Sequence, residues 1–412
     1  MRSAQVAALA AAAVLCGAAA ARAQAPAAPA DPDLSTEQMR RAGPFHVRPF
    51  ALIKDFGYDD NVRFNAQSRE GDSTATAGGG IDALLLTGDR GGLRLFQEFD
   101  YVAFQRNASL DHWNGWGRAR GILLLKRFLL SLEDQFHSER ERPTAEIDFR
   151  LRRASNAVTA ALRTLGGGRL GLEAHARGER IEYASDDPML GDAVGRLSRD
   201  EATLSVLGRV RILPKTAFFL EGVVSSIVFD NRSDGRDTRK HALLPGFRFD
   251  PSASVQGDFK VGPLVLATRD RLGEDYHGIV GEGHLSARLG RAARVKGTFD
   301  RDVVFSILAD NLYFVSTSWS AAYEQYFSRR LSGEVSYSRT LDHYPLEVTR
   351  NGPEPFQGIR NDRLIDYRAT VRYRVNPRMA IEASASRLAR VSTDDFYDRV
   401  RNFYTFGSTY TF

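Results

Sequence analysis

Three observations on the sequence predict an all-β fold, a transmembrane antiparallel up-and-down β-barrel of about 18 strands. The last ten residues alternate larger and smaller side chains up to a terminal aromatic, Phe412. Similar alternating stretches recur from residue 45 onward, and short turns alternate with longer polar connections. Side chains of a strand alternate with period 2, so each stretch offers one face to lipid and one to water.

The final strand carries the clearest pattern. Tyr404, Phe406, Tyr410 and Phe412 fall on one face, and small residues such as Thr411 fall on the other. This ending resembles the carboxyl-terminal signature that the outer-membrane insertion machinery recognises in Gram-negative barrels. We therefore assign Phe406, Tyr410 and Phe412 as a candidate insertion signal, with that machinery as an expected partner.

The amino terminus indicates secretion. Residues 1–23 contain a basic start at Arg2, an apolar run and the small-x-small sequence Ala21-Arg22-Ala23, which is the layout of a cleaved signal peptide. Residues 24–44 are rich in Ala, Pro and Asp, so we expect a flexible periplasmic leader. The barrel is assigned to residues 45–412. The single cysteine, Cys16, lies in the signal peptide, so no disulfide or thiolate metal site is expected in the mature chain.

Composition excludes several function classes. No apolar stretch after the signal peptide approaches the roughly 20 residues of a transmembrane helix. The chain has 56 Lys and Arg against 51 Asp and Glu, and the excess is spread without a basic cluster, so nucleic acid is not an expected partner. The eight histidines are scattered, and we expect no metal and no cofactor.

Turn residues divide the barrel region into strands. Tight turns rich in Gly, Asp, Asn and Pro supply the backbone angles that hairpins need. They are predicted at 89–92, 126–127, 166–168, 214–215, 250–252, 290–292, 328–330 and 376–377. Eight hairpins, a first strand at about 46–57 and a last strand at about 398–412 make eighteen strands. Both chain ends then lie on the periplasmic side.

The strands have one charged face, which cannot pack as a dry core and must line water. A barrel of this size encloses an aqueous channel. The candidate lumen-lining residues are Arg209, Arg211, Glu282, His284, Arg288, Asp366, Arg368, Arg372 and Arg374. Arg301, Arg339 and Arg387 fall on the opposite face near the long connections, where they would meet outer-membrane lipids and lipopolysaccharide.

Two connections and one residue pair bear on function. The connection 343–361 is the longest predicted and could fold into the lumen, whereas 307–310 is shorter than the others, so the strand count depends most on it. His284 and Ser286 share a strand face, as do the His and Ser of outer-membrane phospholipases, but they face the lumen and have no evident orienting partner. We expect no enzyme activity.

Two segments resemble a known family. The first strand ends in Gly57-Tyr58-Asp59-Asp60-Asn61-Val62, and a later hairpin reads Gly246-Phe247-Arg248-Phe249-Asp250-Pro251-Ser252-Ala253. Both are similar to the β-barrel porin 2 family, over residues 47–412. The motif Tyr58, Asp59, Asp60 and Asn61 falls at the loop rim, either as a turn or as a contact for an emerging sugar chain.

The resemblance implies a functional class. The family is often encoded with capsule or exopolysaccharide export genes, which implies passage of polysaccharide and contact with periplasmic export proteins. A general diffusion porin for small solutes is the second interpretation, and a lipid-modifying barrel enzyme is the third.

Overall fold

The computed structural model describes residues 34–36, 39–66, 68–142, 146, 150–165, 168–185, 191–231, 235–251, 253–269, 275–308, 311–350 and 355–412. The predicted signal peptide and most of the predicted leader lie outside the described residues. The end of the leader forms a short strand, β1 (Arg40–Ala42), which pairs with the first strand of the wall. In the part of the chain described, no helix is long and apolar enough to cross a membrane.

Eighteen strands form the wall. In chain order they are β2 (Phe45–Asp59), β3 (Asp72–Leu86), β4 (Gly91–Phe104), β5 (His112–Leu124), β6 (Phe128–Glu141), β7 (Leu151–Thr164), β8 (Leu170–Ala184), β9 (Arg199–Leu213), β10 (Thr216–Phe229), β11 (Thr238–Phe249), β12 (Val255–Thr268), β13 (Tyr276–Leu289), β14 (Ala293–Phe305), β15 (Tyr313–Tyr326), β16 (Leu331–Arg350), β17 (Phe356–Asn376), β18 (Met379–Ser392) and β19 (Arg399–Thr411). A five-residue helix, α2 (Gly191–Gly195), lies between β8 and β9.

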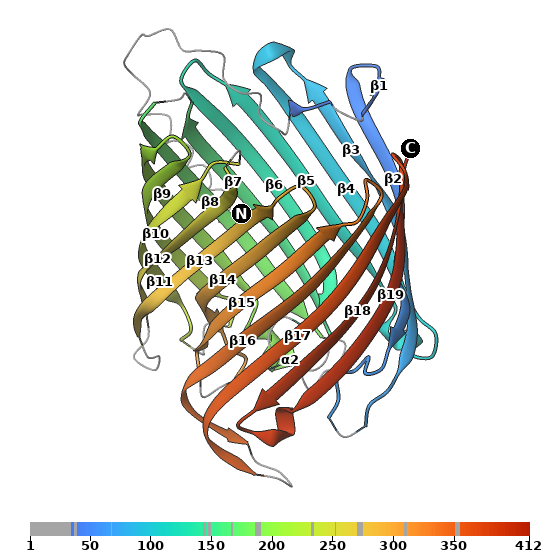
Figure 1. Cartoon of the computed structure of the whole chain (residues 1–412). Helices are drawn as coiled ribbons and strands as arrows, with labels where there is room; N and C mark the ends of the chain where they lie inside the picture. Colours follow the sequence, from blue (N-terminus) through green and yellow to red (C-terminus); the bar gives the residue numbers. More distant parts are fainter. Residues whose placement is uncertain are drawn as a thin grey trace.

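The sheet is closed and antiparallel. Each wall strand pairs with its neighbours in sequence, and β19 pairs with β2, so the 19 strands less β1 make a ring of eighteen. The strands run obliquely around the barrel, and β1 and the carboxyl terminus lie at the same end (Figure 1). The predicted tight turns fall where the observed strands are joined into hairpins, so the predicted fold is confirmed. We call the end of the barrel that holds these turns, β1 and the carboxyl terminus the turn end, and the opposite end the loop end.

The two faces of the wall differ as predicted. Large apolar side chains are exposed on the outside, for example Leu132, Leu204 and Ile279 at 59%, 50% and 61%. The side chains that alternate with them point to the inner face, where they form ion pairs along the wall, for example Lys260 with Glu221 at 2.8 Å. Arg301, Arg339 and Arg387 pair across the sheet with Thr317, Trp319 and Tyr367, in register with the outer face.

The first and last strands are joined at the loop end by the motif at residues 58–61. Asp59 is fully buried and pairs with Arg401 at 2.6 Å. Asp60 accepts hydrogen bonds from the backbone and side chain of Asn402, both at 2.6 Å. Asn61 donates to the carbonyls of Asn65 and Val400. Tyr58 is 48% exposed and pairs with Tyr404. The polar residues of this motif therefore link β2 to β19 at the loop end.

Two predicted connections differ from the structure. The segment 343–361 was predicted to be the longest loop, but β16 continues to Arg350 and β17 begins at Phe356. Charged residues are paired inside these strands: Arg360 and Asp362 are fully buried, 2.6 Å apart, and Arg360 lies over the rings of Tyr344 and Tyr397. The short connection at 307–310 does separate two strands, but their ends leave the wall.

The hairpin of β14 and β15 bends into the barrel. Pairing of β13 with β14 stops at Arg301, and pairing of β15 with β16 begins at Val315, so the residues between form no backbone ladder with either neighbouring strand. One face of this segment packs on inward side chains of β10–β13, with Phe305 against Phe229 at 5.0 Å. The other face packs on β16, with Phe314 against Tyr344 at 5.0 Å. We call residues 302–308 and 311–314 the inward hairpin.

Candidate pore lumen

Groups from several loops hold the tip of the inward hairpin. Arg236, between β10 and β11, donates to the carbonyls of Ser306 and Leu312, the latter at 3.1 Å. Glu146, between β6 and β7, accepts from the Ser306 hydroxyl and from the Ile307 backbone N–H at 2.7 Å. Arg196, after α2, donates to the carbonyl of Ile307 at 3.3 Å. Loops that are distant in sequence therefore converge on one point inside the loop end.

The Glu146 carboxyl group is fully enclosed at this point. Burial raises its pKa above the ordinary value, while the hydrogen bonds from Ser306 and Ile307 and the charges of Arg360 and Arg236 act against that rise. The docked tip thus favours the protonated form of Glu146 more than water does. Docking of the hairpin is consequently coupled to pH.

The predicted lumen residues lie on the inner face of the wall. Arg372 donates to Glu382 at 2.9 Å, Glu282 pairs with Lys260 at 2.9 Å, and Asp366 lies 3.8 Å from Arg368. Arg209, Arg211, His284, Arg288 and Arg374 occupy inner-face register positions on their strands. The lumen is therefore lined by charges of both signs.

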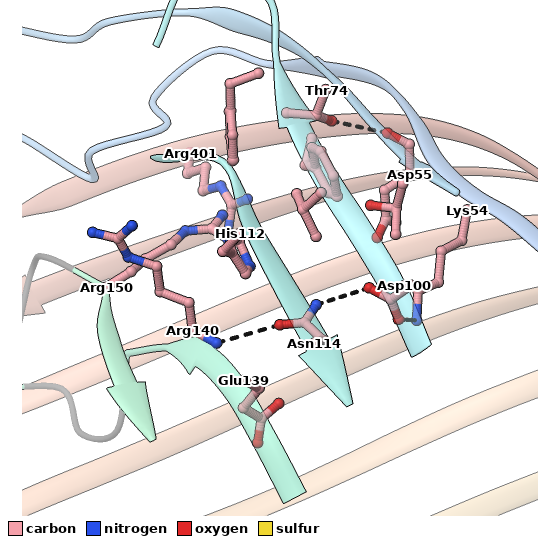
Figure 2. A pocket seen from close by; sticks show the side chains of 14 residues that line it. Lys54, Asp55, Thr74, Asp100, His112, Asn114, Glu139, Arg140, Arg150 and Arg401 are labelled. Carbon is pink, nitrogen blue, oxygen red and sulfur yellow. Dashed lines mark hydrogen bonds and ion pairs between the residues drawn. The ribbon is translucent and has the colours of Figure 1, made fainter. Parts of the chain in front are cut away.

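A recess of about 210 Å³ opens on the inner wall near the loop end (Figure 2). In Figure 2, Arg401, His112 and Arg150 lie close together, and Lys54 lies beside Asp100. The Lys54 ammonium group is 2.7 Å from Asp100, and Asp100 also accepts from Asn114 at 2.8 Å. The strands β2, β3, β4, β5, β6 and β19 all contribute to this recess.

Arg150 is the least compensated cation of the recess. Its guanidinium lies over the Phe104 ring at 5.5 Å and forms no ion pair with the residues that the structure describes. Burial lowers its pKa to about 10; the nearby charges of Arg401 and Arg140 act in the same direction, and those of Asp59 and Asp55 act against it. An anion placed here would relieve that repulsion.

A second recess, of about 310 Å³, lies at the turn end between β9 and β12. Arg209, Arg211, Lys215 and Arg248 line it together with Asp250 and Asp258. Arg248 also reaches Glu173 at 3.0 Å. Basic residues outnumber acidic ones by four to two in this recess and by four to three in the loop-end recess.

Sequence reasoning missed the groups that fix the hairpin and the loop-end recess. Glu146, Arg150 and Arg236 lie outside the strands, where no periodicity assigns a face. His284 and Ser286 do share the inner face, next to Asp258 and Gln256 of β12. Among the described residues, no group of three or more His, Cys, Asp or Glu side chains could hold a metal ion.

A closed ring of eighteen strands with an apolar exterior, a charged interior and an inward hairpin defines a bacterial outer-membrane channel. The comparisons with known proteins give its family. The chain belongs to the Putative beta-barrel porin 2 family, whose model matches residues 39–405. No curated protein matches the sequence.

A solved structure shares the fold at low sequence identity. Pseudomonas aeruginosa OccK2 (OpdF) in complex with glucuronate is 12% identical, covers 89% of this chain and 97% of its own, and gives a TM-score of 0.51. Pseudomonas aeruginosa OprD is also matched, with 10% identity, coverage of 92% of this chain and 97% of its own, and a TM-score of 0.47. The similarity to OccK2 concerns the fold alone.

Proposed function

We propose that this protein is a passive channel for small polar solutes, with a preference for anions, across the outer membrane. The observation that carries the proposal is the charged lumen, which the inward hairpin narrows from the loop end. A lumen of charged side chains lowers the barrier for hydrated solutes, and a hairpin inside it limits their size.

The basic recesses support the preference for anions. Arg150 lies in the loop-end recess without a carboxylate partner among the described residues, and the turn-end recess holds four basic residues against two acidic ones. A solute anion entering from either end would meet an excess of positive charge. Such fields raise the local concentration of counter-ions near a pore mouth.

Passage of a polysaccharide, the leading prediction from the sequence, has less support. The family comparison carries no substrate, and the solved structures support only the fold. A polymer would also have to pass the inward hairpin, whose tip is bonded by Glu146, Arg196 and Arg236. The general diffusion channel therefore accounts better for this lumen.

Liposome swelling tests the proposal. The purified mature protein in vesicles should admit small sugars and sugar acids, glucuronate included, faster than in protein-free vesicles. Rates should fall steeply with solute size and favour a sugar acid over the neutral sugar of equal size. Equal rates with and without protein would refute a channel, and free passage of long oligosaccharides would favour polymer export.

A further inference from the structure

A row of four rings crosses the inner wall on the strands β2 to β6. Phe50 stacks on Phe96 with 5.7 Å between ring centroids, Phe96 lies 4.5 Å from Trp116, and Trp116 lies 5.8 Å from His137. The four residues come from β2, β4, β5 and β6, and each is partly exposed. We call them the ring row.

The ring row faces the lumen rather than lipid. Trp116 pairs across the sheet with Glu98 and His137, on the same face as the ion-paired residues of β4 and β6. Trp113, three positions earlier on β5, is on the opposite face and is 68% exposed. Exposed rings are expected on the lipid side, whereas a continuous row of rings on a charged inner wall needs another explanation.

The backbone beneath the row makes room for it. A Cβ atom at Gly80 would lie 2.6 Å from the Phe50 ring and 2.2 Å from the Gln97 carbonyl oxygen. Gly80 lies on β3, between the strands that carry Phe50 and Phe96. The absence of a side chain there lets the Phe50 ring extend across β3 toward Phe96.

Polar pairs border the row on both sides. Toward the turn end, Asp82 binds Arg48 at 2.8 Å and Arg94 at 2.6 Å. Arg118 binds Glu133 at 2.8 Å on the same side. Toward the loop end, Lys54 lies 3.3 Å from Glu98, and Asn114 donates to Asp100 at 2.8 Å. Donors and acceptors thus stand together along both edges of an apolar strip.

We infer that the ring row is a binding subsite for pyranose sugars within the lumen. A pyranose has apolar C–H faces that fit an aromatic ring and a rim of hydroxyls that both donate and accept hydrogen bonds. The bordering arginines are already paired with carboxylates, so they suit hydroxyls better than the single charge of an aromatic acid. The inference rests on the proposed function, because a sugar reaches the row through the lumen.

The fluorescence of Trp116 can be used to measure sugar binding at the ring row. The chain has three tryptophans, so the double variant Trp113→Phe/Trp319→Phe retains only Trp116. In detergent, cellobiose and glucose should change its emission in a saturable way, whereas the open-chain polyol sorbitol should not. No change with sugar, an equal response to sorbitol, or a response to benzoate alone would overturn the inference.

A matched pair of variants tests the role of the row. In the single-tryptophan background, Phe96→Ala should weaken sugar binding at least about fivefold, because ring stacking of this kind is lost. Phe99→Ala removes a ring that is 53% exposed on the outer face of the same strand and should leave binding unchanged. Equal effects of the two variants would contradict the inference.

Current recordings separate this inference from the proposed function. If the reconstituted barrel conducts ions but cellobiose neither reduces the current nor alters Trp116 emission, the subsite fails and the channel stands. If Trp116 responds to sugar but the barrel does not conduct, the subsite is supported and the channel fails.

Discussion

Release of the inward hairpin by Arg236→Ala is the most informative perturbation. Arg236 is 5% exposed, and its guanidinium group donates to two carbonyls of the hairpin and lies over the Phe229 ring at 5.5 Å. A hydrogen bond from a charged donor contributes about 1.5–3 kcal/mol, and its loss leaves a buried carbonyl unsatisfied. The Leu312 carbonyl retains a hydrogen bond from the Ser306 N–H at 3.1 Å. We therefore take the lower limit of this range, about 1.5 kcal/mol, for each of the two bonds that Arg236 donates.

The expected loss is therefore about 3 kcal/mol, which corresponds to an increase of about 100-fold in the population of the undocked hairpin. A cysteine at Val303, which is 8% exposed in the hairpin, reports undocking through its reaction with an impermeant thiol reagent. The only native cysteine, Cys16, falls in the predicted signal peptide, so the reporter would be the sole thiol of the mature chain.

Matched variants decide the outcome. Val303→Cys should react slowly, and the added Arg236→Ala should accelerate the reaction about 100-fold. Arg239→Ala, which removes an exposed arginine from β11 close by, should change the rate less than about twofold, as surface substitutions usually do. Equal rates in the two variants would refute the account of how the hairpin is held.

Three further predictions concern single groups. Because the pKa of Glu146 is raised in the docked state, docking should weaken as the pH rises from the ordinary carboxyl pKa through the raised one. The thiol of Val303→Cys should therefore react faster over that pH range, relative to the same reporter in a Glu146→Gln background. A ratio of the two rates that does not change with pH would exclude the coupling. Arg150→Gln should lower the anion-to-cation permeability ratio several-fold in reversal-potential measurements, since one charge near an ion pathway contributes about 1 kcal/mol or more. Arg152→Gln, which replaces an exposed residue of the outer face, should leave this ratio unchanged. An unchanged ratio for Arg150→Gln would remove the loop-end recess from the ion pathway. Deletion of Phe412, whose N–H bonds the Pro49 carbonyl at 3.0 Å, should reduce the folded, heat-modifiable form in outer membranes severalfold relative to Phe327→Ala, and equal yields would argue against the insertion signal.

The regular part of the fold was predictable because each strand alternates independently of its neighbours. The outer face must be apolar and the inner face polar, so the residue pattern alone located the strands, the turns and the inner-face positions of residues such as Glu282 and Arg372. The even number of strands is what an antiparallel ring requires, and the pairing of β19 with β2 closes it. None of this required knowledge of contacts between distant residues.

The inward hairpin was not predictable by the same reasoning. Both faces of this hairpin carry apolar residues: Val303 and Phe305 pack on β10–β13, and Phe314 packs on β16. This pattern indicates a strand that is covered on both sides, but it does not indicate which parts of the wall cover it. The segment 343–361 was predicted to be a polar connection, yet Arg360 within it forms a buried ion pair with Asp362 and lies over the ring of Tyr397. Long-range pairing of charges leaves no local signal.

Planar-bilayer recording of the purified mature protein tests the central claim most directly. Insertion of the folded, heat-modifiable barrel should produce discrete, long-lived ion-conducting steps, with larger steps for Arg236→Ala than for the native protein. Folded protein that inserts without conducting in either form would contradict the assignment of this barrel as a channel.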